Sequence, residues 1–229
     1  MTLRLGGNRF NFPNIIEFLY IYIDLFVFHT YRIPVQSKTP RILDCGAHIG
    51  MASMYFKKIY PTAVITCFEP NPNALTYLRK NLSQNDITDV EIVPAAVWNT
   101  DASISFAHST WSWGDHVDTS TSHRTFEVPT VRLGKYLNQR IDILKMDIES
   151  AEETVLKDCG SQLKHVQALM LEYHCNFSSM PNDLDAILDV LHKNNFTVKL
   201  GALGSFLYQL KKRFHLKMPF VMIIHAYQK

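Results

Sequence analysis

The chain contains little cysteine, and its charges nearly cancel. Its 229 residues include only four cysteines, none of them in a CxxC pair or at the spacing of zinc ligands. We therefore expect neither a disulfide framework nor a structural zinc site, and the thiols indicate a reduced, cytoplasmic protein. The formal net charge is +2, from 23 Lys and Arg against 21 Asp and Glu. Because nucleic-acid binding relies on concentrated positive charge, we expect no nucleic-acid partner.

The sequence also has no long apolar run without charges. The most apolar stretch, Phe10 to Phe28, is interrupted by Glu17 and Asp24, whereas a membrane-spanning helix needs about 20 residues with few or no charges. It has no basic start or small-residue cleavage site of a signal peptide. We expect an amphipathic helix within an N-terminal appendage of residues 1–40, and no stable membrane insertion. Its apolar face is suited to cover a pocket as a lid or to form a homodimer.

From residue 41 onward, short apolar runs alternate with stretches of helical spacing. This alternation is typical of βαβ units and predicts an α/β domain over residues 41–229. We expect a mainly parallel, doubly wound sheet of six or seven strands with helices on both faces. The predicted strands are 41–45, 63–69, 90–97, 141–147, 166–174, 196–200 and 220–227, and the predicted helices are 49–60, 71–85, 150–159 and 181–195. Residues 101–132 alternate with period 2, which predicts an inserted β-hairpin with a long connection around two Trp residues.

Ligands of doubly wound sheets bind beyond the carboxyl ends of the strands. The first such end carries Gly46, where the backbone can turn tightly, and Gly50, where a helix can pack closely. Asp44 stands where a dinucleotide fingerprint has glycine. This carboxylate repels a pyrophosphate but suits a cationic group such as the amino end of S-adenosylmethionine, so it disfavours an NAD-dependent oxidoreductase.

Two further strand ends carry acidic residues. Glu69 follows Gly46 by 23 residues, a position from which a carboxylate can accept both ribose hydroxyls of a nucleoside. Asp147 ends a buried strand and faces the predicted cleft. We interpret Glu152 and Glu153 as acidic residues of the ordinary kind at a helix N-terminus.

Glu172 and His174 lie on one face of the strand 166–174 because side chains alternate along a strand. His174, oriented by Glu172 or by Asp147, is suited to take a proton from a hydroxyl nucleophile. We therefore predict His174, Glu172 and Asp147 as the catalytic residues. A rival hypothesis makes the same three residues the ligands of a divalent cation. Our main prediction includes no metal.

Together these pieces resemble the FkbM family of S-adenosylmethionine-dependent methyltransferases. The matching stretches are ILDCGAHIGMASMYF, FEPNP, VPAAVWN, SWG, VPTVRL, ILKMDIESAE and LEYH, between about residues 20 and 200. The resemblance implies a Rossmann-like class I methyltransferase fold and, often, O-methylation of a hydroxyl on a sugar or natural product. His48 stands where the family usually has Asn, and Ser150 where it usually has Gly. Ser150 lacks the freedom of Gly to adopt a positive φ.

The resemblance also implies roles for single residues. Asp44, Gly46 and Gly50 would surround the methionine part of the cofactor, and Glu69 would bind its ribose. Ala95 and Ala96 would flank the adenine, and Asp147 would lie near the sulfonium. Glu172 and His174 would line the acceptor pocket. The predicted S-adenosylmethionine contacts are Asp44, Gly46, Ala47, His48, Gly50, Glu69, Pro70, Asn71, Ala95, Ala96, Asp147 and Glu149.

The acceptor itself stays open at this level. A small molecule, a glycan and a peptide are all compatible with the predicted pocket, and a carboxylate is an alternative to a hydroxyl as the methylated group. A scaffold that binds the cofactor without turnover is the non-enzymatic alternative. It predicts cofactor affinity without methylation of any hydroxylated compound.

Overall fold

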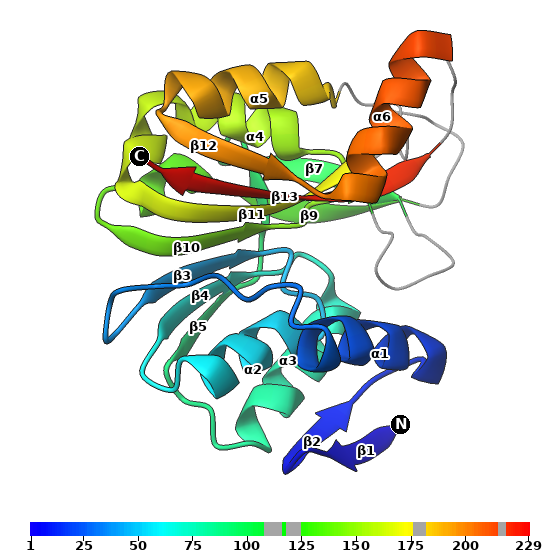
Figure 1. Ribbon diagram of the computed structural model, residues 1–229. Coiled ribbons are helices and arrows are strands. Elements are labelled where there is room, and N and C mark those ends of the chain that lie inside the picture. The colour runs from blue at the N-terminus through cyan, green and yellow to red at the C-terminus, as the bar shows by residue number, and fades with distance from the viewer. Residues whose placement is uncertain (108–115, 118–124, 176–181, 215–218) are drawn as a thin grey trace.

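The computed structural model describes residues 1–107, 116–117, 125–175, 182–214 and 219–229 (Figure 1). Among these residues a seven-stranded sheet has the order β12-β13-β11-β10-β3-β4-β5. β13 runs antiparallel to both of its neighbours, and the other pairs are parallel. This confirms the predicted mainly parallel sheet. The strands are β3 (Arg41–Cys45), β4 (Val64–Phe68), β5 (Val90–Val93), β10 (Ile141–Met146), β11 (Val166–Cys175), β12 (Phe196–Leu200) and β13 (Phe220–Gln228).

Helices cover both faces of the sheet, as predicted (Figure 1). One face carries α2 (Met51–Ile59) and α3 (Pro72–Ser83), and the other carries α4 (Glu152–Cys159), α5 (Leu184–Lys193) and α6 (Ala202–Phe214). Every residue of β10 is buried, which is typical of a central parallel strand packed on both sides. The helix α6 connects β12 to β13 in the sequence, and it was not among the predicted helices.

The N-terminal segment differs from the single helix that its apolar run predicts. It begins with a hairpin of β1 (Thr2–Leu5) and β2 (Asn8–Asn11), and α1 spans only Ile15–Tyr22 before a π-helical turn, Ile23–Val27. The reason is local: Pro13 lacks an N–H donor, and the Asn14 side chain caps α1 by accepting the N–H groups of Ile16 and Glu17. Buried aromatic residues of this segment, such as Phe10 and Phe18, pack in the same cluster as residues of α2.

The predicted strand 90–97 is in fact two strands. β5 ends at Val93, and after Pro94 and Ala95 the chain enters β6 (Ala96–Trp98), which belongs to a second sheet. Pro94 cannot donate a hydrogen bond to a ladder, so the chain leaves the main sheet there. The second sheet has the order β6-β9-β7-β8, with β7 (Ser103–Ala107), β8 (His116–Val117) and β9 (Thr125–Arg132).

The antiparallel pairing of β7 with β9 confirms the inserted hairpin. Most of its predicted connection, including both Trp residues at positions 111 and 113, lies outside the described residues. Within the described part of the chain, no helix has the length and apolar character needed to cross a membrane.

Candidate active site

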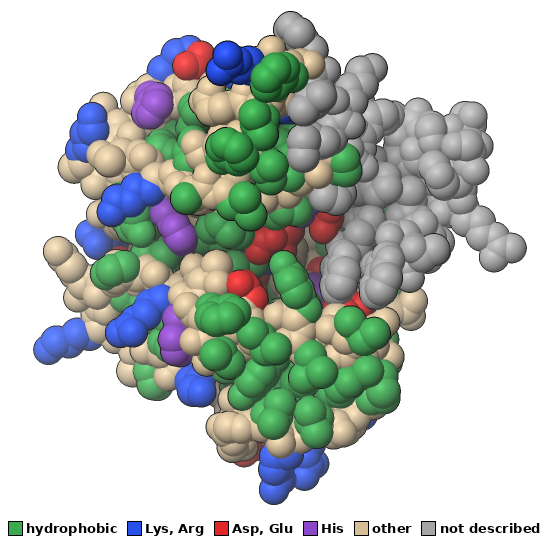
Figure 2. Space-filling view, turned by 45° about the vertical axis from the view of Figure 1, so that its right-hand side comes forward, with side chains coloured by type: hydrophobic (Ala, Val, Ile, Leu, Met, Phe, Trp, Pro, Cys, Tyr) green, Lys and Arg blue, Asp and Glu red, His purple; other side chains and the backbone are tan. Residues whose placement is uncertain are grey.

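A cavity of about 650 Å³ lies at the carboxyl ends of β3, β4, β10 and β11. Its size is in the range of small-molecule and cofactor sites. Figure 2 shows acidic side chains in a hollow with hydrophobic side chains around it. The cavity is lined by the predicted residues Gly46, Ala47, His48, Glu69, Pro70, Asn71, Ala96, Asp147, Glu149, Glu172 and His174, and also by residues of α1, of the π-helical turn and of β7.

Gly46 forms the floor where β3 ends. Its φ is +81°, and a Cβ atom there would lie only 1.8 Å from the carbonyl oxygen of Asp147. No side chain fits at this position, so the two strand ends can approach each other only because residue 46 is glycine. The N–H groups of Gly46 and Ala47 both donate to the carbonyl oxygen of Phe68, at 3.0 and 2.9 Å, which fixes the loop against β4.

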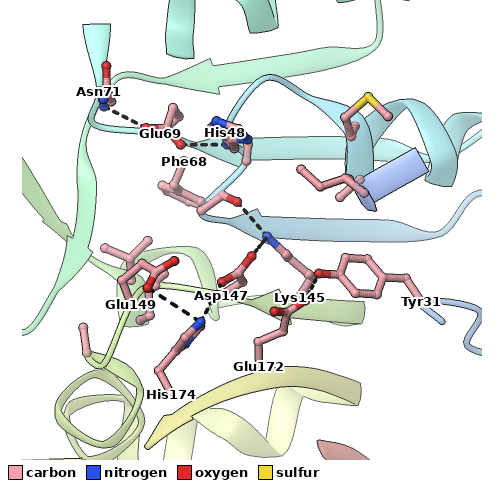
Figure 3. Close-up of a pocket in the computed structure, with 18 of the residues that line it drawn as sticks. Tyr31, His48, Phe68, Glu69, Asn71, Lys145, Asp147, Glu149, Glu172 and His174 are labelled. Carbon is pink, nitrogen blue, oxygen red and sulfur yellow. Dashed lines mark hydrogen bonds and ion pairs between the residues drawn. The ribbon is translucent and has the colours of Figure 1, made fainter. Parts of the chain in front are cut away.

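Glu69 joins this loop to the next one. One carboxylate oxygen accepts the N–H of His48 at 2.7 Å, and the other accepts the N–H of Asn71 at 2.8 Å (Figure 3). The side chain is buried. Burial raises the pKa of Glu69 to about 7, against the opposing effect of the two backbone hydrogen bonds. The predicted ribose-binding residue therefore lines the cavity with a carboxylate held in a fixed orientation.

His48 links the loop to the N-terminal segment. Its Nε2 lies 3.2 Å from Oε1 of the buried Glu17 in α1. Burial lowers the pKa of His48 to about 4, although the charge of Asp147 acts in the other direction, so the ring in this contact is neutral. His48 has φ +50°, a left-handed conformation that Asn and His adopt more readily than most residues. This explains how the chain accommodates its departure from the Asn of the resembling family.

Lys145 is a buried cation that sequence reasoning missed. Its ammonium group donates to the Gly46 carbonyl oxygen at 2.6 Å and lies 3.3 Å from Asp147 (Figure 3). It also lies 3.4 Å from Asp44. Burial alone would lower the pKa of Lys145, but the charges of Asp147 and Asp44 raise it above its ordinary value. The available signal was a single Lys inside the otherwise apolar core of a predicted strand.

Three predicted cofactor contacts do not line the cavity. Asp44 is fully buried, accepts a hydrogen bond from the Ser53 hydroxyl at 2.6 Å, and contacts Lys145, which lines the cavity. Gly50 has φ +87°, and a Cβ atom there would lie 2.6 Å from the Leu78 side chain. Its role is close helix packing. Ala95 is buried, and only its neighbour Ala96 lines the cavity.

An acidic cluster surrounds His174 at the other end of the cavity. Nε2 of His174 lies 3.6 Å from Oε2 of Glu149 and 3.8 Å from Oδ1 of Asp147, and Nδ1 lies 3.1 Å from Oε1 of Glu152 (Figure 3 shows the first two contacts). Glu152 is fully buried and also accepts the amide of Asn182 at 2.6 Å. Its interpretation as an acidic residue of the ordinary kind at a helix N-terminus was wrong, since it is the partner of the imidazole.

The surroundings of His174 favour its charged form. Burial alone lowers the pKa of His174, but the hydrogen bond with Glu152 and the charges of Glu149, Glu152 and Asp147 raise it well above its ordinary value. Glu149 is itself mostly enclosed, and burial raises its pKa to about 8. An imidazole held as imidazolium has no lone pair with which to accept a proton.

Glu172 is paired with a residue that sequence reasoning did not single out. The hydroxyl of Tyr31 donates to Glu172 (Figure 3). Of the two orienting partners predicted for His174, Asp147 is the one that contacts its ring, at 3.8 Å from Nε2. Burial, followed by the charge of Asp147, raises the pKa of Glu172 to about 7. Both side chains line the cavity. Tyr31 lies more than a hundred residues from its partner, and no local pattern in the sequence connects the two.

A comparison with known families identifies the family to which the chain belongs. The profile of the methyltransferase FkbM domain matches residues 44–198, well over half of the chain. The chain belongs to the FkbM methyltransferase family. The match begins within β3 and ends within β12, so it contains the Gly46 loop, Glu69 and the cluster around His174.

Relatives and solved structures agree with this FkbM assignment. The chain is 44% identical over 71 residues to methyltransferase sdnD of Sordaria araneosa, which covers 31% of this chain and 27% of that one. It is 25% identical to the 2-O-methyltransferase NoeI of Sinorhizobium fredii over 69% of this chain and 73% of that one. The crystal structure of methyltransferase FkbM from Methylobacillus flagellatus has a TM-score of 0.56 at 14% identity, over 85% of this chain and 45% of that chain.

The first relative and the FkbM crystal structure are both longer than their aligned parts. The chain spans 27% of sdnD and 45% of the crystallised FkbM protein. At 14% identity the structural likeness shows the fold, which is the class I methyltransferase fold predicted from the sequence.

Proposed function

We propose that this protein is an S-adenosylmethionine-dependent methyltransferase that methylates a hydroxyl group of a sugar or natural product. One observation carries the proposal: the Gly46 loop and Glu69 open into the same cavity as a cluster of proton-binding side chains. Membership in the FkbM family and the 2-O-methyltransferase among its relatives support it. The acceptor class is a small molecule, a glycan or a peptide.

The residues at the first end of the cavity fit S-adenosylmethionine. The backbone of Gly46 and Ala47 leaves room for close approach, and the Glu69 carboxylate has lone pairs left for ribose hydroxyls after accepting two N–H groups. Ala96 and Phe68 supply apolar wall for the adenine. Bound there, the cofactor would supply a methyl group already activated by a sulfonium.

The residues at the second end would position the acceptor and take its proton. In the proposed reaction an acceptor oxygen forms a bond to the methyl carbon while the carbon–sulfur bond breaks and its electron pair stays with sulfur. The hydroxyl proton passes to a side chain of the protein. We assign this step to Glu172, which faces the cavity, and not to His174, both of whose ring nitrogens face carboxylates. His174 and Asp147 then position the acceptor.

This assignment predicts that Glu172→Gln lowers turnover by about 10²–10⁴-fold, the usual contribution of a general base. Affinity for S-adenosylhomocysteine, which does not depend on that carboxylate, should stay unchanged in calorimetry. The comparison variant is His174→Asn. Near-normal turnover of Glu172→Gln together with an inactive His174→Asn would return the base role to His174.

We propose that residues 1–40 act as a lid over the cavity. Side chains of α1 and the π-helical turn line the cavity, and contacts from Glu17 and Tyr31 tie the segment to it. Its outer face exposes Ile16 and Phe28 at 66% and 73%. A homodimer would form through this face, and sedimentation of Phe28→Ser against the unaltered chain tests that.

A cytoplasmic location fits the four cysteines, all of them free and buried thiols. The alternatives to O-methylation are methylation of a carboxylate and a scaffold without turnover. Both share the cofactor end of the cavity and differ only at its acceptor end.

The first experiment is calorimetric titration with S-adenosylmethionine, S-adenosylhomocysteine and NAD. We expect micromolar binding of the first two, weakened at least tenfold in Glu69→Ala, and no binding of NAD. Glu91→Ala is the matched control, because Glu91 is an exposed carboxylate on the adjacent strand β5. Methyl transfer to pools of hydroxylated and carboxylated compounds then separates the alternatives. Silence from all three ligands would overturn the proposal.

A further inference from the structure

The cluster around His174 brings three potential ligand atoms for a cation close together. One atom each of Asp147, Glu149 and His174 lies within 4.8 Å of the other two. The sequence-based hypothesis of a metal had named Glu172 as the third ligand, but Glu172 is engaged by Tyr31. Glu149 takes that place, because the left-handed turn at residues 149 and 150 (φ +53° and +75°) returns its side chain toward His174.

We propose that Asp147, Glu149 and His174 bind a divalent cation of the Mg²⁺ or Mn²⁺ type, and that Glu152 orients the imidazole for it. Two carboxylates and one imidazole are hard and borderline donors, which suit these ions. Three ligands from the chain leave coordination positions for other oxygens. The proposal deepens the proposed function, on which its catalytic role rests.

The fourth carboxylate gives this cluster a feature that a plain group of acidic residues lacks. Glu152 is fully buried and contacts Nδ1 of His174 at 3.1 Å. A carboxylate on the far nitrogen holds a metal-binding histidine in the tautomer whose other nitrogen offers its lone pair to the ion. That other nitrogen, Nε2, is the one that faces Glu149 and Asp147.

The excess of carboxylates at this end of the cavity also favours a bound cation. Asp147, Glu149 and Glu172 line the cavity, and the buried Glu152 contacts Nδ1 of His174. Among the described residues, the lysine next to them is Lys145, which is shared between Asp147 and Asp44. Like charges this close destabilise each other unless a cation lies between them. A divalent ion at Nε2 replaces the proton that the carboxylates otherwise hold there.

The ion would act on the acceptor and not on the cofactor. A hydroxyl oxygen beside a divalent cation loses its proton more easily, because the cation stabilises the developing negative charge. The proton would pass to Glu172, which lies on the same strand face as His174. The acceptor oxygen would form a bond to the methyl carbon as the carbon–sulfur bond breaks, and the electron pair of that bond would stay with sulfur.

The test is a titration of the purified protein with Mn²⁺, followed by the electron paramagnetic resonance signal of the free ion. We expect one ion per chain. Glu149→Gln should weaken binding at least 100-fold, and Glu152→Gln, which changes only orientation, by about 10–100-fold. Glu153→Gln is the matched control: Glu153 is the next residue of α4, pairs with Lys157 outside the cavity, and should leave binding unchanged. If Glu149→Gln does not fold, Asp147→Asn replaces it.

Absence of Mn²⁺ binding, or binding that Glu149→Gln does not alter, would overturn the cation site. S-adenosylhomocysteine is titrated into the same samples. If that ligand binds and Mn²⁺ does not, the cation site is wrong and the methyltransferase proposal stands. If Mn²⁺ binds with the expected variant pattern and the nucleoside does not, the site stands without its proposed reaction.

Discussion

Ser150 stands in a backbone conformation that its side chain disfavours. Its φ is +75°, its side chain is buried, and its hydroxyl has no hydrogen-bond partner within the described chain. A left-handed conformation costs a non-glycine residue about 1–2 kcal/mol, and glycine avoids this cost. Part of the gain is offset, because glycine has more conformational freedom to lose from the unfolded chain. We expect Ser150→Gly to stabilise the protein by about 1 kcal/mol and to raise its melting temperature by about 2–4 °C.

Thermal unfolding measures this difference, and Ser150→Ala serves as the control. That variant removes the unpartnered hydroxyl but keeps the Cβ atom, so it should recover less of the stability. Equal melting temperatures of the two variants would mean that the hydroxyl, and not the backbone, is the source of the cost.

Glu69 should make stability depend on pH. Its folded pKa of about 7 lies above its ordinary value of 4.5, so the folded state binds the proton more tightly than the unfolded chain. The resulting stability is fully present below pH 4.5 and is lost as the pH rises to about 7. Over that window the free energy of unfolding should fall by about 3 kcal/mol from this group.

Urea unfolding of the protein and of Glu69→Gln at pH 5 and pH 8 isolates this contribution, because the other titrating groups are common to both proteins. The variant should lose less stability than the unaltered chain between the two values. An equal loss in both would show that Glu69 has an ordinary pKa in the folded protein.

Residues of the site were predictable from sequence where they stand directly at the end of a predicted strand. Gly46, Glu69 and Asp147 each follow an apolar run directly. Glu152 and Lys145 were missed for a physical reason: their partners come from other strands and from the turn at 149–150. The role of a charged residue at a helix start or inside a strand can be assigned only when the position of its oppositely charged partner in the fold is known.

At the scale of elements, Asn81 joins α3 to β2 and to the loop between β3 and α2. This buried residue of α3 accepts the backbone N–H of Asn11 at 2.6 Å and donates to the carbonyl oxygens of Asn11 and Ile49. Asn81→Ala leaves these buried groups without partners, at about 1–3 kcal/mol each. We expect a loss of about 3 kcal/mol or more in the free energy of urea unfolding.

Asn73→Ala on the same helix is the control, since Asn73 is exposed and such substitutions change stability by about 0.5 kcal/mol or less. If both variants unfold alike, the bonds of Asn81 do not contribute to the stability of the N-terminal hairpin against α3.

The order of strands and helices was predictable because periodicity is a local property. The boundaries that failed depend on single residues: Pro94 ends β5, and Pro13 with Asn14 delays α1. The hairpin of β1 and β2 and the helix α6 were missed. Each is short or weakly apolar, and packing against the rest of the molecule stabilises it more than its own pattern does.

At the scale of the whole molecule, the cavity joins two halves of the fold. The strands β3 and β4 with the N-terminal segment form one side, and β10 and β11 form the other. A ligand that binds only the folded state stabilises it by about 2.7 kcal/mol at a concentration 100 times its dissociation constant. At that concentration S-adenosylhomocysteine should therefore raise the free energy of unfolding by that amount, which moves the unfolding midpoint to a higher urea concentration.

Glu69→Ala should reduce the gain at the same ligand concentration, whereas Glu91→Ala should not. A midpoint that does not move in the unaltered chain would show that the nucleoside does not bind in the cavity, and it would remove the basis for the methyltransferase proposal.

The bonds between Asn11 and Asn81 set a condition on biosynthesis. The aromatic side chains of the first 26 residues, such as Phe10 and Phe18, leave the ribosome before the helix that covers them exists. At about 5–20 residues per second, the 70 residues between the two asparagines take about 4–14 s to appear. During that interval the apolar rings of the nascent segment are exposed, because the leucines of α3 in the same cluster have not yet been synthesised.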